Sequence, residues 1–217
     1  TAFSEEVEIH SVLVRLDGGD VEGWGESAPY RAPNFSPEWS GGAFALLRDW
    51  LAPALVGQDI RDGADISARL APFKGNYFAK AGLDIAFWDA AAKQRGQCLW
   101  RLIGGQGPTV AAGADIPVLN RIDELLSAVG EARDQGFPRV KLKFRRGWGL
   151  DMVRAVRGAF PDLHMHVDCN AGFTLADADM FRALDAYGLA MIEQPLAHND
   201  LIDHARLQAM LETPICL

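Results

Sequence analysis

Residues 139–144, "RVKLKF", have the alternating polarity of a β-strand. Three apolar residues alternate with Arg139, Lys141 and Lys143, and successive side chains of a strand point to opposite faces. The charged face can meet water, as in an ordinary half-buried strand, or it can point into the interior of the protein. The sequence that follows decides between these two arrangements.

The second half of the chain alternates between short apolar strands and amphipathic helices. This pattern begins after Gly104-Gly105 and favours parallel βαβ units. The expected strands are "VAAGADIPV", "RVKLKF", "LHMHVDCN", "LAMIEQP" and "TPICL", and the expected helices lie near residues 121–135, 148–159, 174–187 and 200–212.

The predicted strand ends are evenly spaced. Val118, Lys143, Asp168 and Glu193 recur every 25 positions. A constant strand–helix period favours a (β/α)-barrel over a doubly wound sheet, whose crossovers vary more in length. We therefore predict an α/β fold with a truncated TIM-type (β/α) barrel over residues 107–217, ending in its fifth strand. A doubly wound sheet is the alternative.

The first part of the chain, residues 1–106, predicts a separate α+β domain. Two strands flank the turn at residues 17–20, which is a hairpin signal. One helix is expected to begin at Ser36 as its N-cap, and a second is expected to run from Asn76 to Gly96. No pattern in this part indicates chemistry.

The composition is that of a globular protein and argues against several classes of function. The 217 residues carry a net charge of −8 without a basic stripe, which disfavours nucleic-acid binding. The apolar runs are too short for a membrane span. Cys98, Cys169 and Cys216 are too widely separated for a disulfide framework, so we expect a cytoplasmic protein.

Polar residues stand at the expected carboxyl ends of three successive strands, where the active site of a (β/α)-barrel lies. If the apolar residues of each strand pack outward on the helices, the charged residues point inward. Buried ammonium groups are costly unless they are paired, and the next two strands supply carboxylates as partners. The strand-end set comprises Lys141, Lys143, Asp168, Asn170, Glu193 and Gln194.

The strand-end residues predict a particular chemistry. Asp168 and Glu193, with an amide nearby, form an all-oxygen ligand set that favours Mg²⁺, with Mn²⁺ as a second choice. A lysine desolvated beside a divalent cation has a lowered pKa and can act as a base. Known enzymes that pair a lysine base with Mg²⁺ use it to remove a proton next to a carboxylate, and these groups suggest the same reaction. A buried structural ion-pair network would perturb the same residues and is the alternative.

Four histidines lie near these strands. His164 and His166 share the inward parity of Asp168. We expect His164 to be packed in the core and His166 to lie nearer the site, most simply without a role in the chemistry. His198 and His204 stand among polar residues, so we expect them to be exposed to solvent.

Several segments resemble the enolase superfamily. "GFPRVKLKFRRGWG", "VDCNAGFTLADA", "LAMIEQPLAHNDLIDHARLQ" and "TPICL" are similar to its muconate-lactonizing subgroup, especially the o-succinylbenzoate synthases and N-succinylamino acid racemases. "GWGES", "KGNYFAKAGLDIAFWDAAAKQRG" and "LIGG" resemble the capping domain of that family. The resemblance implies that residues 1–106 are a capping domain whose amino-terminal strand is missing.

The resemblance also implies roles for the strand-end residues. Lys143 would be the acid/base and Lys141 would support it electrostatically. Asp168 and Glu193 would bind the metal, with Asn170 and Gln194 as neighbouring polar groups. The implied reaction is Mg²⁺-dependent proton abstraction alpha to a carboxylate, through an enediolate.

The implied activity is that of an o-succinylbenzoate synthase, an N-succinylamino acid racemase, or both. A dipeptide epimerase or a muconate cycloisomerase would use the same lysines and metal. The implied partner is a small carboxylate substrate, and the full-length enzyme would be a homo-oligomer. The alternative to an enzyme is a non-catalytic barrel fragment.

The sequence departs from the family pattern in two respects. "GADIPV" and "VDCNAG" differ modestly from the usual sequences of the family at these segments, so the exact substrate stays open. Family members also carry a third metal-binding aspartate directly after a segment like "TPICL" and a second catalytic lysine on the sixth strand. The constant spacing places the next strand end just past Leu217, so we expect a fragment that is inactive when expressed alone.

Overall fold

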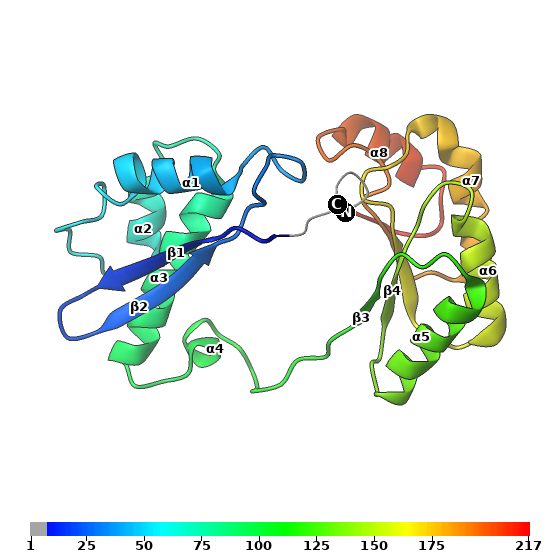
Figure 1. Ribbon diagram of the computed structural model, residues 1–217, viewed down its shortest axis with the longest axis horizontal. Helices are drawn as coiled ribbons and strands as arrows, with labels where there is room; N and C mark the ends of the chain where they lie inside the picture. Colours follow the sequence, from blue (N-terminus) through cyan, green and yellow to red (C-terminus); the bar gives the residue numbers. More distant parts are fainter. Residues whose placement is uncertain (1–7) are drawn as a thin grey trace. The chain divides into compact units, whose positions relative to one another are not determined.

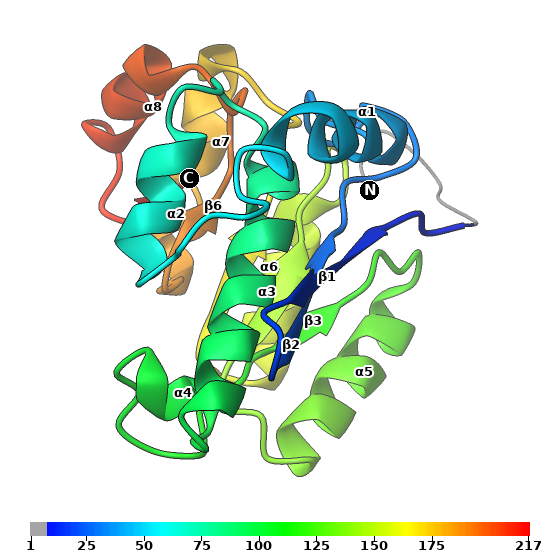
Figure 2. The ribbon, with the colours of Figure 1, turned by 90° about the vertical axis from the view of Figure 1, so that its left-hand side faces the viewer.

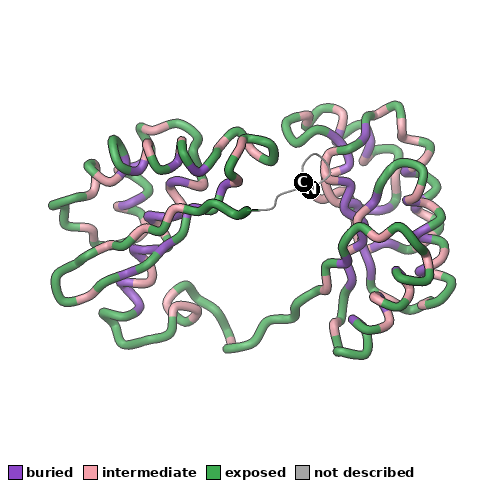
Figure 3. The backbone as a smooth tube through the Cα atoms, in the orientation of Figure 1, coloured by how far each residue is buried: buried purple, intermediate pink, exposed green. Residues whose placement is uncertain are grey.

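The computed structural model describes residues 8–217 and divides the chain into two compact units, with the boundary between Thr109 and Val110. The sequence predicts this boundary three residues earlier. Each unit has its own cluster of buried apolar side chains. Figure 3 marks the buried residues of both units in purple along the backbone. None of the helices within residues 8–217 is both long enough and apolar enough to span a membrane.

The first unit combines a two-stranded antiparallel sheet with short and long helices (Figure 1). Its elements are β1 (Val12–Asp17), β2 (Glu22–Ser27), α1 (Ser40–Leu46), a π-helical turn (Leu47–Leu51), α2 (Gly63–Leu70), α3 (Tyr77–Gln94) and α4 (Leu99–Leu102).

The predicted hairpin is confirmed, and its turn contains Gly19 in the left-handed region, with φ +86°. Figure 2 shows α3 running along this hairpin. Burial alternates along β2, and the buried Gly23 and Gly25 face α3 so closely that a Cβ at either would collide with the helix backbone. The "GWG" motif therefore lets helix and sheet backbones meet.

The two predicted helices of the first unit differ in outcome. Asn76 is the N-cap of α3, as predicted, but the helix expected from Ser36 begins only at Ser40. Ser36 Oγ instead accepts a hydrogen bond from the backbone N–H of Glu38 at 3.1 Å. The Glu38 carboxylate in turn accepts from the N–H groups of Phe78 and Ala79, and so satisfies free donors at the start of α3.

The second unit is a five-stranded parallel sheet whose strands follow their order in the chain, β3-β4-β5-β6-β7. A doubly wound sheet would reverse its order at a switch point, so that alternative is wrong. The elements are β3 (Ala114–Ile116), α5 (Ile122–Asp134), β4 (Val140–Lys143), α6 (Gly149–Ala159), β5 (Met165–Asp168), a 3₁₀ turn (Leu175–Asp177), α7 (Ala178–Arg182), a second 3₁₀ turn (Asp185–Tyr187), β6 (Ile192–Glu193), α8 (Leu201–Gln208) and β7 (Ile215–Cys216).

The strand register supports the predicted spacing in the middle of the sheet and corrects it at the edges. Lys143 pairs with Asp168, and Asp168 pairs with Glu193. On one side Ile116 pairs with Leu142, so Val118 lies beyond the equivalent position. On the other side Glu193 pairs with Cys216 rather than with a position past Leu217.

The apolar face of the sheet forms the core of the second unit. Val140, Leu142, Met165, Val167 and Ile192 are completely buried in one cluster that also contains the apolar faces of the helices. α5, α6 and α7 lie along one side of the strands (Figure 1). The outward packing of alternate residues is therefore confirmed, and their neighbours along each strand point to the other face.

Candidate functional site

The charged residues of β4, β5 and β6 lie on the face of the sheet opposite this core. The side chain of Lys141 is 22% exposed, that of Lys143 is 23% exposed, and that of Glu193 is 24% exposed. Asp168 is 2% exposed and is the most deeply buried of the group. The lysines of "RVKLKF" are therefore largely withdrawn from bulk water.

These side chains form a row of alternating charge across four strands. Oδ2 of Asp168 lies 2.8 Å from Nζ of both Lys141 and Lys143. Lys141 Nζ also donates to Glu193 Oε1 at 2.8 Å. Lys143 Nζ has a second carboxylate, Asp115 of β3, at 3.7 Å. Each buried ammonium group is thus paired, as its desolvation requires.

Asp168 and Glu193 are brought together by Lys141. Since the Lys141 ammonium lies 2.8 Å from an oxygen of each, those oxygens are no farther apart than twice that distance. Two carboxylates at this separation, both oxygen donors, suit a hard cation such as Mg²⁺. Within residues 8–217, however, the geometry brings no three His, Cys, Asp or Glu side chains around one point that could hold an ion.

The ion pairs set the pKa values within the row. Burial alone would raise the pKa of Asp168, but hydrogen bonds from Lys141, Lys143 and the Asn170 N–H outweigh it and lower the pKa below its usual range. Burial likewise disfavours the charged form of Lys141, but its hydrogen bonds to Asp168 and Glu193 raise its pKa above the usual value. Lys141 is therefore held as an ammonium ion.

The backbone that follows β5 and β6 is in the left-handed region. Asn170, Ala171 and Gln194 have φ of 46°, 58° and 42°, a conformation that is unfavourable for residues other than glycine. Ala171 N–H donates to Gln194 C=O at 2.8 Å, which ties the two strand ends together. Asn170 donates to both oxygens of Asp168, at 2.9 Å from its N–H and 3.0 Å from its Nδ2.

Two polar residues of this face were not among the predicted site residues. Asp115 pairs with Lys141 and lies on the same face of the sheet. It was missed because the predicted end of β3, at Val118, was one residue too far along the chain. His166 is buried, and its Nε2 lies 3.5 Å from Glu193 Oε2. From its parity with Asp168, His166 was expected to lie nearer the site, but without a role in the chemistry.

Two other histidines differ from the expectation. His164 is exposed rather than packed in the core, because it precedes the first residue of β5. His204 is buried rather than exposed: its Nε2 accepts from the Leu196 N–H at 3.3 Å, and its Nδ1 lies 2.7 Å from Asp200 C=O. These contacts hold the loop after β6 against α8. His198 is exposed, as expected.

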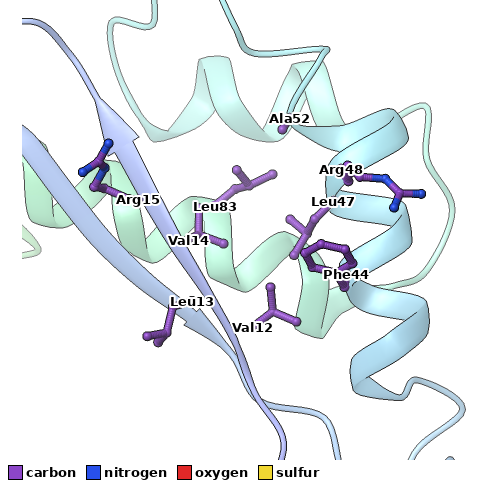
Figure 4. Close-up of a pocket in the computed structure, with 9 residues that line it drawn as sticks. All are labelled: Val12, Leu13, Val14, Arg15, Phe44, Leu47, Arg48, Ala52 and Leu83. Atoms are coloured by element: carbon purple, nitrogen blue, oxygen red, sulfur yellow. The ribbon is translucent and has the colours of Figure 1, made fainter.

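An apolar depression lies elsewhere, in the first unit between β1 and the α1 region (Figure 4). It contains none of the strand-end residues, and its lining is mostly aliphatic. The lining residues are Val12, Leu13, Val14, Arg15, Phe44, Leu47, Arg48, Ala52 and Leu83.

Two family profiles match this chain. Residues 1–104 match the mandelate racemase / muconate lactonizing enzyme N-terminal domain, and residues 124–217 match the enolase C-terminal domain-like family. A hydrophobic dipeptide epimerase from Citrifermentans bemidjiense is 31% identical over 99% of this chain and 61% of its own length.

More similar relatives cover the whole chain. An o-succinylbenzoate synthase from Geobacillus kaustophilus is 42% identical over 100% of the chain and 58% of its own length. An N-succinylamino acid racemase from Thermus thermophilus is 38% identical over 100% of the chain and 59% of its own length. The chain thus spans less than three fifths of these relatives.

The fold agrees with these matches. The crystal structure of an enolase superfamily member from Listeria innocua has a TM-score of 0.92 and 34% identity, over 94% of this chain and 56% of that protein. Together with the two family profiles, this similarity covers both units. The chain belongs to the enolase superfamily, in the group of mandelate racemase and muconate lactonizing enzymes.

Proposed function

We propose that the protein containing this chain abstracts a proton alpha to a substrate carboxylate with the help of a divalent cation. The observation that carries the proposal is the row of Lys143, Asp168, Lys141 and Glu193 across adjacent strand ends. It supplies a candidate base beside two candidate metal ligands. A purely structural ion pair would need only one partner for each charge.

The contacts of the two lysines favour different roles. Lys141 Nζ lies 2.8 Å from an oxygen of each of two carboxylates, so its protons are already engaged on both sides. Lys143 stands at the end of β4, with Asp168 at 2.8 Å and the more exposed Asp115 at 3.7 Å. We therefore assign proton abstraction to Lys143 and electrostatic support to Lys141.

Asp168 and Glu193 would hold Mg²⁺, or Mn²⁺ in its place. When bound, the cation would compensate the two carboxylates and stabilise negative charge that develops on the substrate carboxylate. Asn170 holds both oxygens of Asp168 in place, and Gln194 fixes the neighbouring strand end through its backbone contact with Ala171. These contacts orient the ligands without touching the reacting atoms.

The reaction that the relatives favour is the formation of o-succinylbenzoate, with racemisation of N-succinylamino acids as a second activity of the same site. Both begin with removal of a proton next to a carboxylate. Epimerisation of dipeptides is a more distant alternative. The substrate would be a small carboxylate, the assembly a homo-oligomer, and the compartment the cytoplasm, in keeping with the free thiols of Cys98, Cys169 and Cys216.

The proposal is tested with the full-length gene product in D₂O containing Mg²⁺. We expect o-succinylbenzoate to form, or N-succinylamino acids to exchange their alpha proton for deuterium, and a chelator to stop either process. If the alpha proton is exchanged but no o-succinylbenzoate forms, the activity is racemisation alone. The absence of both reactions, with the protein folded and loaded with metal, would contradict the proposal.

A further inference from the structure

His166 is a buried polar residue for which the proposed mechanism has no use. It lies on β5, two residues before Asp168 and on the same face, and it pairs in register with Lys141. Its side chain is 4% exposed. Nε2 lies 3.5 Å from Glu193 Oε2, whereas Nδ1 is buried and has no hydrogen-bond partner in the described part of the chain.

The Glu193 carboxylate is contacted from two sides. Oε1 accepts from Lys141 at 2.8 Å, and Oε2 faces His166. We propose that His166 is a positioning residue whose Nε2–H points at Oε2 and fixes the orientation of the Glu193 carboxylate. This inference rests on the proposed function, in which Glu193 is a metal ligand.

The surroundings of the ring determine which nitrogen carries the proton. A proton on Nδ1 would be a buried N–H without an acceptor, and the lone pair of Nε2 would then face a carboxylate oxygen. Both arrangements are unfavourable. The tautomer with its proton on Nε2 avoids both of these arrangements.

The contact is longer than an ideal N–H···O bond, so it acts by orienting the carboxylate more than by binding it tightly. Without His166, the neighbour at Oε2 is lost and the contact with Lys141 is left alone to set the rotation of the Glu193 carboxylate. Groups that orient a metal ligand in this way typically change metal affinity by about 10–100-fold when they are removed. His166 should therefore act on cation binding without touching the cation.

The first test reads the tautomer directly in the metal-free wild-type chain. Long-range ¹H–¹⁵N correlation spectra should show that Nε2 of His166 carries a proton. A ring whose Nε2 carries no proton would overturn the inference. This result does not depend on whether the chain binds a metal.

The second test measures Mn²⁺ affinity by electron paramagnetic resonance, with thermal unfolding as the check on folding. His166→Leu should weaken Mn²⁺ binding by at least ~10-fold. His166→Gln, which can place an N–H near the position of Nε2, should restore most of the affinity. The matched control is His164→Leu, at the exposed histidine just before β5, which should bind as wild type does.

The outcomes separate the two proposals. Wild-type affinity in folded His166→Leu, or equal losses in the Leu and Gln variants, would overturn the positioning role. If His166→Leu does not fold, the Gln variant and the tautomer decide. If the wild type itself binds no Mn²⁺, the proposed metal site fails, whereas the tautomer still decides whether His166 donates to Glu193.

Discussion

The two ends of the parallel sheet are stabilised by different interactions. At the carboxyl end, lysines and carboxylates pair with one another, and the backbone at Asn170, Ala171 and Gln194 is left-handed. At the amino end, a single guanidinium, that of Arg157, donates only to backbone carbonyls, which precede β5 and β6.

Interactions that only stabilise the fold are thus found at the amino end, whereas the candidate reactive groups lie at the carboxyl end. Arg157 holds the loops before β5 and β6 together through carbonyls that are neutral. They belong to Tyr187, Phe160, Pro161, Leu163 and Gly188. The opposite end keeps ionised groups and strained backbone, which persist only where the surrounding structure enforces them. In barrels of this kind the carboxyl end is where chemistry occurs.

The largest expected effect lies at the carboxyl end and concerns turnover. In the full-length gene product, Lys143→Ala should lower turnover by about 10²–10⁴-fold, the usual contribution of an acid/base group. Metal binding and thermal stability should remain close to wild type, because Lys141 still pairs with both carboxylates. Steady-state kinetics and calorimetry on the same samples provide the comparison.

Lys141→Ala is the companion variant. It leaves Asp168 and Glu193 without their shared ammonium, so we expect weaker activity together with altered metal affinity. Near-normal turnover in Lys143→Ala, combined with inactivity in Lys141→Ala, would reverse the roles assigned to the two lysines.

The next largest effect lies at the amino end and concerns stability. Arg157→Ala removes hydrogen bonds from a charged donor to carbonyls in two loops, and should lower the free energy of unfolding by about 2–3 kcal/mol. The control is Arg154→Ala, one turn earlier on α6. This variant loses an exposed ion pair with Asp151, so its free energy of unfolding should change by no more than about 0.5 kcal/mol. Urea unfolding measures both. If both variants lost the same free energy of unfolding, the hydrogen bonds of Arg157 would not stabilise the fold more than an exposed ion pair does.

The smallest expected effect is a difference in acid sensitivity. A bidentate pair with Arg146, near the carboxyl end, lowers the pKa of Asp177 from 3.8 to about 2. A lowered folded-state pKa contributes stability that is present above pH 3.8 and is lost as the pH falls toward 2. Asp177→Asn should therefore flatten the stability curve in this window.

Arg157 provides the contrast in the same titration. Its acceptors are neutral carbonyls, so the destabilisation caused by Arg157→Ala should be similar at pH 7 and pH 3. The control for Asp177 is Asp179→Asn, at a carboxyl group that is 93% exposed, which should leave the curve unchanged. An Asp177→Asn curve parallel to wild type below pH 4 would contradict the account.

Much of the second unit could be predicted from local patterns. The alternation in "RVKLKF" determines which face of β4 is buried, because side-chain parity in a strand depends only on the backbone. The same parity brings Asp168 and Glu193 to the face of Lys141. The site is thus predictable where residues sit on regular strands in the middle of the sheet.

Features that depend on tertiary contacts could not be predicted. The start of α1 depends on Glu38 capping a different helix, about 40 residues away. The segment expected as one helix over residues 174–187 is broken into short pieces, one of them begun by a capping box at Thr174. His204 is buried by the loop that it holds, although its sequence neighbours are polar.

Asp168 and Glu193 are expected to bind one divalent cation together. The most direct test of this expectation is Mn²⁺ binding to the wild-type chain and to Asp168→Asn, followed by electron paramagnetic resonance. Asp115→Asn serves as the control, because Asp115 lies 3.7 Å from Lys143 and outside the pair bridged by Lys141. We expect one Mn²⁺ site in the wild type and in Asp115→Asn, and at least ~10-fold weaker Mn²⁺ binding in Asp168→Asn. Equal Mn²⁺ affinity in all three folded proteins would contradict this expectation.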